Sequence, residues 1–164
     1  MKKKKYLFVS LIAIIGILIF TVVITSVNKK RTVNDLMSQL ENAINSSNLE
    51  KVINLYPKYY RDTVSELLSQ NKLNEFNNKI GEIKIEVVNK TNYDLSQAKD
   101  IQDKIYNNYD INLKIDDYQL LVINVTNNIG SVFEQSQLQI IKINGEYYLY
   151  TEYYLGDLIQ CFVE

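Results

Sequence analysis

The feature that most constrains this chain is an uncharged apolar segment near its N-terminus. Residues 6–27 read YLFVSLIAIIGILIFTVVITSV, and 15 of these 22 residues are Leu, Ile, Val or Phe. As an α-helix the segment would be about 33 Å long, enough to cross the roughly 30 Å hydrocarbon core of a bilayer. We therefore expect a transmembrane helix at 6–27, between a basic tail at 1–5 and a juxtamembrane segment at 28–32.

A cleaved signal peptide is the competing interpretation of the same segment. Signal peptides have an apolar region of about 7 to 15 residues followed by a small-residue cleavage site. This segment is longer and has no A-x-A pattern, so we expect an uncleaved anchor. The four lysines at 2–5 and the terminal amine outweigh Lys29, Lys30 and Arg31, which favours a cytoplasmic N-terminus. The rest of the chain is then expected outside the cell membrane.

The charge and cysteine content of the remainder exclude several classes of protein. All seven basic residues up to position 31 flank the apolar segment, and from position 32 onward 11 basic residues face 19 acidic ones, a net charge of −8. Nucleic-acid binding requires clustered Lys and Arg, so we expect no nucleic-acid partner. The chain has no His and one Cys, which excludes His-dependent catalytic triads, disulfide frameworks and Cys/His zinc modules. We expect no cofactor.

Capping signals and helical periodicity predict three short amphipathic helices between Thr32 and Gly81, and a fourth after Asp94. Pro57 is expected to end the second helix and Gly81 to stand at the C-cap of the third. The expected N-caps, each with its partner three residues later, are Thr32 with Asp35, Ser47 with Glu50, Thr63 with Glu66, and Asp94 with Gln97.

The pattern changes to strand periodicity at Ile83, Ile85 and Val87 and again after the fourth helix. We expect strands at 111–115, 118–126, 131–143 and 146–154, with a turn at Asp116-Asp117, a hairpin turn at Asn144-Gly145 and a short C-terminal helix from 156. Helices gathered on one side of an antiparallel sheet give an α+β fold, with residues 33–164 as one domain.

This order of elements resembles the NTF2-like (cystatin-like) superfamily over roughly residues 33–155. The hairpin IKINGEYYL at 141–149 is similar to the hydrophobic, turn-glycine, charged, aromatic hairpin common in that superfamily, with Tyr147 where Trp is frequent. In particular the chain resembles single-anchor extracytoplasmic domains of Gram-positive bacteria, of which the VirB8-like assembly components of secretion and conjugation systems are one type. The resemblance implies a curved sheet whose concave face and covering helices form a pocket or a docking surface.

Tyrosines crowd the end of the predicted sheet. On a strand Tyr148, Tyr150 and Tyr154 share one face, and we interpret them as a possible interaction surface because Tyr is enriched at interfaces. The structural alternative, which is favoured here, is that Tyr simply suits a half-exposed sheet and takes the place of Trp and Phe. For a second cluster, Tyr56, Tyr59 and Tyr60, packing against the sheet is favoured over ligand contact.

The remaining candidate groups have structural explanations. Asp110, Asn112 and Asp116 do not form a calcium loop, because Ile115 replaces the sixth-position glycine and Leu121 the final glutamate. Cys161 is expected to be a buried small apolar residue. We expect no catalytic and no metal-binding residues.

Three classes of function follow from these predictions. The first is a non-enzymatic, membrane-anchored domain that contacts a protein partner, or itself, at the outer face of the membrane. The second is a small-molecule binding domain that uses the cone between helices and sheet. An enzyme is the third class and would need a buried carboxylate in that cone.

Overall fold

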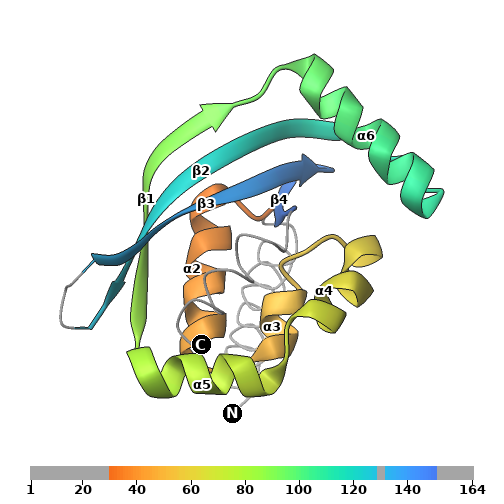
Figure 1. Cartoon of the computed structure of the whole chain (residues 1–164). Helices are drawn as coiled ribbons and strands as arrows, with labels where there is room; N and C mark the ends of the chain where they lie inside the picture. Colours follow the sequence, from red (N-terminus) through yellow and green to blue (C-terminus); the bar gives the residue numbers. More distant parts are fainter. Residues whose placement is uncertain (1–29, 129–131, 151–164) are drawn as a thin grey trace, which may run out of the picture. The chain divides into compact units, whose positions relative to one another are not determined.

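The computed structural model describes residues 30–128 and 132–150, and the elements below carry the labels of Figure 1. The expected membrane segment, the strand beyond Tyr150, the C-terminal helix and Cys161 lie outside these residues. No helix in the described ranges is both long and apolar enough to span a membrane.

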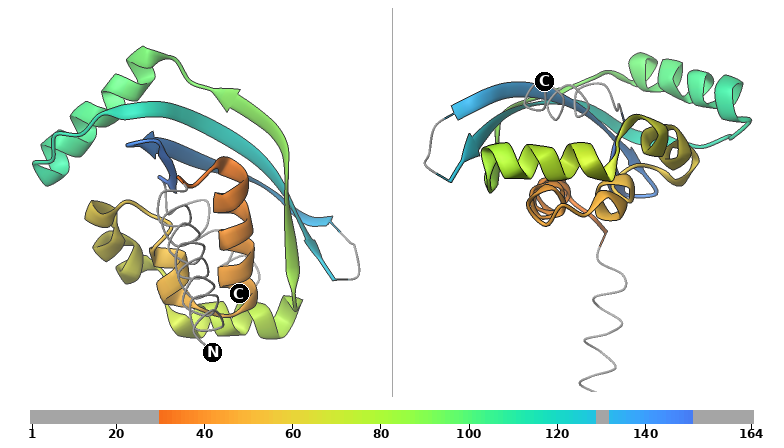
Figure 2. Two further views of the ribbon diagram at one scale, coloured as in Figure 1. Left: turned by 180° about the vertical axis from the view of Figure 1, so that it is seen from behind. Right: turned by 60° about the horizontal axis from the view of Figure 1, so that its bottom comes forward.

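The described residues form an α+β domain from Arg31 onward, with a four-stranded antiparallel sheet in the order β1-β2-β3-β4. The sheet curves over helices α2 to α5, and α6 lies at one end of it (Figures 1 and 2). The helices are α2 (Val33–Asn45), α3 (Leu49–Ile53), α4 (Arg61–Leu67), α5 (Gln70–Ile80) and α6 (Leu95–Tyr109), with a short 3-10 helix η1 (Lys58–Tyr60) before α4. The strands are β1 (Ile83–Asn92), β2 (Ile115–Asn127), β3 (Val132–Ile143) and β4 (Glu146–Leu149).

Local capping signals account for several of these boundaries. The capping box of Thr32 and Asp35 is confirmed at the start of α2. Gly81 ends α5 with φ +78°, as expected of a C-cap glycine. The tight β3–β4 hairpin is confirmed as well, with Asn144 and Gly145 both at positive φ.

Two helix predictions were wrong. The N-cap of α3 is Asn48 and not Ser47: the Asn48 side chain accepts a hydrogen bond from the Lys51 N–H, whereas Ser47 has φ +47°. The predicted third helix is two helices, and Thr63 lies inside the first of them. The chain is extended at Leu68, which buries this leucine in the core, and Ser69 caps the second helix.

The strand predictions also need correction around Asp116-Asp117. This pair is not a solvated turn between two strands but lies inside β2, which begins at Ile115. The register against β3 shifts between Ile115 and Asp117, a β-bulge in which Asp116 is the extra residue. The bulge keeps Ile115 and Tyr118 on the same face of the sheet. Residues 111–114 precede the strand.

The expectation that all helices cover one side of the sheet was wrong too. Alternate side chains of the strands belong to two separate hydrophobic clusters. Leu121, Ile123 and Ile140 pack with α2 to α5, whereas Tyr118 and Ile141 pack with α6. The domain therefore has a main core on the concave face and a second, smaller core against α6.

Candidate functional site

Helix α6 forms one wall of the candidate site. It begins with a capping box in which the Gln97 N–H donates to the Asp94 carboxylate (2.9 Å) and the Asp94 N–H donates to the Gln97 side chain (3.0 Å). Hydrogen bonds from the Ser96 hydroxyl and the Gln97 N–H lower the pKa of Asp94. Ala98, Ile101 and Ile105 form its buried stripe, which fixes the helix against the sheet.

A groove with two hollows runs along α6, and its walls come from segments far apart in the sequence. The hollow near the N-terminal half of α6 has a volume of about 340 Å³ and is lined by Tyr93, Gln97, Asp100, Ile101, Lys104, Tyr118, Gln139 and Tyr150. The hollow near its C-terminal half has a volume of about 270 Å³ and is lined by Tyr59, Tyr60, Thr63, Lys104, Ile105, Asn108, Tyr109 and Tyr150. Lys104 and Tyr150 border both hollows, so we treat them as one tyrosine groove.

The tyrosine rings contact one another in a continuous series along this groove. Tyr93 stacks on Tyr118, with ring centroids 4.2 Å apart and planes at 22°. Tyr150 meets Tyr118 edge-on at 6.3 Å and lies nearly parallel to Tyr60, also at 6.3 Å. Such ring pairs stabilise a fixed arrangement beyond the effect of burial alone. The groove walls are therefore set by packed aromatic rings.

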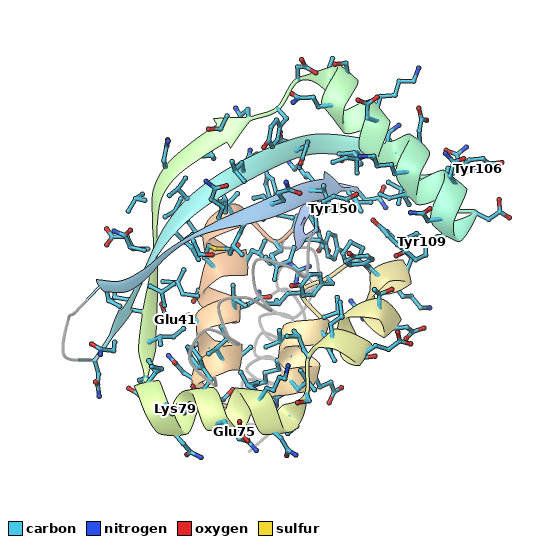
Figure 3. The ribbon with its side chains drawn as sticks, in the orientation of Figure 1. Glu41, Glu75, Lys79, Tyr106, Tyr109 and Tyr150 are labelled. Carbon is cyan, nitrogen blue, oxygen red and sulfur yellow. The ribbon has the colours of Figure 1, made fainter. Side chains whose placement is uncertain are left out.

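The far end of the series lies between η1 and α6. The Tyr59 and Tyr109 ring centroids are 5.2 Å apart. Figure 3 shows Tyr109 at the end of α6 and Tyr150 after β4, both on the side where α6 approaches α4.

The groove also offers polar groups. The Tyr59 hydroxyl oxygen is buried and has no hydrogen-bond partner among the residues that the structure describes. Burial, followed by the nearby Tyr150 and Tyr109, raises the pKa of Tyr59 well above its usual value. Burial also raises the pKa of Tyr150. Both hydroxyls therefore stay protonated at neutral pH and can donate hydrogen bonds. The Tyr59 oxygen itself has no accessible surface, so the polar groups that a ligand in the groove would meet include those of Lys104, Asn108 and Gln139.

Of the three tyrosines predicted to form an interaction surface, only Tyr150 borders the groove. Tyr148 and Tyr150 pack on the α6 side of the sheet and Tyr147 on the other, as their alternation predicts, while Tyr154 lies outside the described residues. Tyr150 borders both hollows. Tyr148 lines neither: its hydroxyl donates to Glu146 (2.8 Å) and the Arg31 guanidinium lies 4.5 Å from its ring centroid.

Sequence reasoning missed most of the groove. Tyr56 is fully buried in the main core, as expected for a tyrosine that packs, but its neighbours Tyr59 and Tyr60 line the groove. Tyr93 and Tyr118 gave no local signal, because a loop tyrosine and a strand tyrosine have ordinary structural explanations.

The concave face of the sheet, expected to form a cone, is occupied by the main core. Leu121, Ile123, Val125 and Ile140 have no exposed surface, and Leu138 is 1% exposed. A ligand pocket at this place would require some of these side chains to move.

A hydrogen-bonded group of three polar side chains lies near the start of β2. The Asp117 carboxylate accepts from the Tyr147 hydroxyl (2.6 Å) and from the Gln119 amide (2.5 Å). Burial first, and then the bond to Asp117, raises the pKa of Tyr147 to about 12. Both donors are used within the group, so it is explained as a link between β2 and β4. Across the described ranges, no three His, Cys, Asp or Glu side chains are grouped so that they could hold a metal ion.

Comparison with known proteins gives no relative for this chain. No family model matches it, and neither a curated protein nor a solved structure does. The fold and the groove therefore carry the functional argument.

Proposed function

We propose that this protein is a membrane-anchored, non-enzymatic domain that contacts another protein at the outer face of the cell membrane. The tyrosine groove along α6 is its docking surface. The anchor is residues 6–27, and the domain is of the NTF2-like kind.

The arrangement of elements supports the family part of this proposal. The curved antiparallel sheet over α2 to α5 and the order helices, strand, helix, strands agree with the plan expected from the resemblance. The position of α6 on the opposite face is a departure that leaves the concave core closed and creates the groove. A VirB8-like role would be a narrower form of the same proposal.

The observation that carries the proposal is the groove itself. Tyrosine combines a large apolar ring with a polar hydroxyl and is enriched where proteins meet. Six tyrosines from distant segments line this surface. They are Tyr59 and Tyr60 of η1, Tyr93 after β1, Tyr109 of α6, Tyr118 of β2 and Tyr150 after β4. The filled concave face supports this choice over a small molecule in the cone.

Site-specific photo-crosslinking in cells tests the proposal. A photoreactive residue at Asn108, which lines the groove, should crosslink to a defined protein partner in the full-length, membrane-bound chain. The matched control is Tyr106, which is 53% exposed on the same helix and lines neither hollow. No protein captured from Asn108, or equal capture from both positions, would contradict the groove as the docking surface.

Location needs a separate measurement. Protease added to intact cells should remove the domain from residue 31 onward. Full protection would place the domain on the cytoplasmic side and contradict the proposed orientation.

A further inference from the structure

We propose that the groove binds an extended, proline-rich segment of a partner protein in the polyproline II conformation, with prolines three residues apart in the two hollows. This inference rests on the proposed function and names the chemistry of the partner.

The spacing of the two hollows along α6 matches the repeat of a polyproline II helix. The α6 residues that line one hollow are Gln97, Asp100, Ile101 and Lys104, and those that line the other are Lys104, Ile105, Asn108 and Tyr109. The midpoints of the two sets are six residues apart, about 9 Å along the axis at roughly 1.5 Å per residue. A polyproline II helix repeats every third residue at about 3.1 Å per residue, so its turn also measures about 9 Å.

The lining chemistry is the second argument. Proline-rich segments dock in aromatic-lined grooves, where flat rings receive the pyrrolidine rings and the rigid ligand loses little entropy. Tyr150 borders both hollows, as a ridge between two proline sites would, and it lies nearly parallel to Tyr60 in the second hollow. Each hollow also has its own tyrosines, Tyr118 in one and Tyr109 in the other.

Hydrogen bonding is the third argument. A polyproline II segment has no internal hydrogen bonds, so its carbonyl groups need donors, and proline offers no N–H in return. The groove is lined by the Asn108 and Gln139 amides and the Lys104 ammonium. These are donor groups in the place where carbonyl oxygens would pass.

We assign this segment to a partner protein. Residues 1–164 contain a single proline, Pro57, and that residue is buried between α3 and η1. These residues therefore offer no two prolines three residues apart.

The test is isothermal titration calorimetry of the full-length protein in detergent micelles. The probe is a synthetic peptide of Pro-Pro-Ala repeats, and the reference peptide is a Gly-Ser repeat of equal length. We expect the proline peptide to bind and the reference not to bind. The Tyr109→Ala and Asn108→Trp variants should each weaken binding about tenfold or more, since one removes a wall of a hollow and the other fills it.

Two controls separate loss of binding from loss of folding. Tyr106→Ala removes a tyrosine from the same helix outside the groove and should leave binding within about twofold. Asn108 is exposed, so Asn108→Trp should keep the unfolding temperature of the parent even where Tyr109→Ala lowers it.

Three results would overturn the inference: no binding of the proline peptide, equal binding of the Gly-Ser peptide, or binding that Asn108→Trp and Tyr109→Ala leave unchanged. If crosslinking from Asn108 captures a protein while the proline peptide fails to bind, the docking proposal stands and only the partner chemistry is wrong. If both experiments fail, both are wrong.

Discussion

Replacing Asn45 by alanine should destabilise the domain, because this side chain covers the open edge of the sheet. In the described sheet β1 is an edge strand, and an edge carries unpaired backbone groups. Asn45, the last residue of α2, donates to the Ile83 carbonyl and accepts from the Ile83 N–H, both at 2.8 Å. The Glu41 carboxylate accepts a hydrogen bond of 2.7 Å from the Ile85 N–H, two residues further along the same strand.

The expected size of the effect follows from these two bonds. A net hydrogen bond contributes about 0.5–1.5 kcal/mol, so Asn45→Ala should lower the free energy of unfolding by about 1–3 kcal/mol. For a domain of this size about 1 kcal/mol corresponds to roughly 4 °C in the unfolding temperature. The assay is urea unfolding of the full-length protein in mild detergent, followed by circular dichroism.

Asn42→Ala is the matched control. Asn42 lies three residues earlier on α2 and is exposed, and within the described part of the chain its side-chain amide makes only a long hydrogen bond of 3.5 Å to the Ser38 hydroxyl. This variant should stay within about 0.5 kcal/mol of the parent. Equal stabilities of the Asn45→Ala and Asn42→Ala variants would refute the idea that α2 caps the sheet edge.

Three further predictions concern stability. Gly81→Ala should lower the free energy of unfolding in urea by about 1–3 kcal/mol, because an alanine would be strained at a φ of +78°. Steric contact adds little, since an added Cβ would meet the Asn128 amide at 3.9 Å. An unchanged free energy of unfolding would contradict this prediction. The pKa of Tyr147 is raised to about 12, so its protonated hydroxyl stabilises the fold fully below pH 10 and this contribution is lost as pH rises towards 12. Tyr147→Phe should therefore lose less stability than the parent across that pH range, and parallel pH profiles would argue against it. Thr32→Ala should cost about 1 kcal/mol by removing the N-cap of α2, measurable as a lower urea midpoint, whereas an unchanged midpoint would show that the cap contributes nothing.

Signals that act over a few residues were predictable from the sequence. The Asp94–Gln97 capping box, the C-cap at Gly81 and the Asn144-Gly145 hairpin each depend on side chains within three or four positions of one another. Alternation along 83–87 likewise placed Ile83 and Ile85 in the core.

The break between α4 and α5 could not be predicted in the same way. The apolar residues of 63–80 follow a helical pattern, in which Ser69 is a local cap signal but does not by itself make Leu68 extended. Its burial in the main core decides the conformation, because an apolar side chain that reaches the core can outweigh a weak local preference for helix.

The sequence by itself therefore determined the apolar N-terminal segment, the α+β class, the starts of α2 and α6 and the β3–β4 turn, since each depends on neighbouring residues. Only the tertiary structure decided that α6 packs on the face opposite the main core, and that Tyr59, Tyr93, Tyr109, Tyr118 and Tyr150 meet in one groove. The physical reason is that strand register and the bulge at Asp116 set which side chains share a face, and register is fixed by packing across the whole sheet.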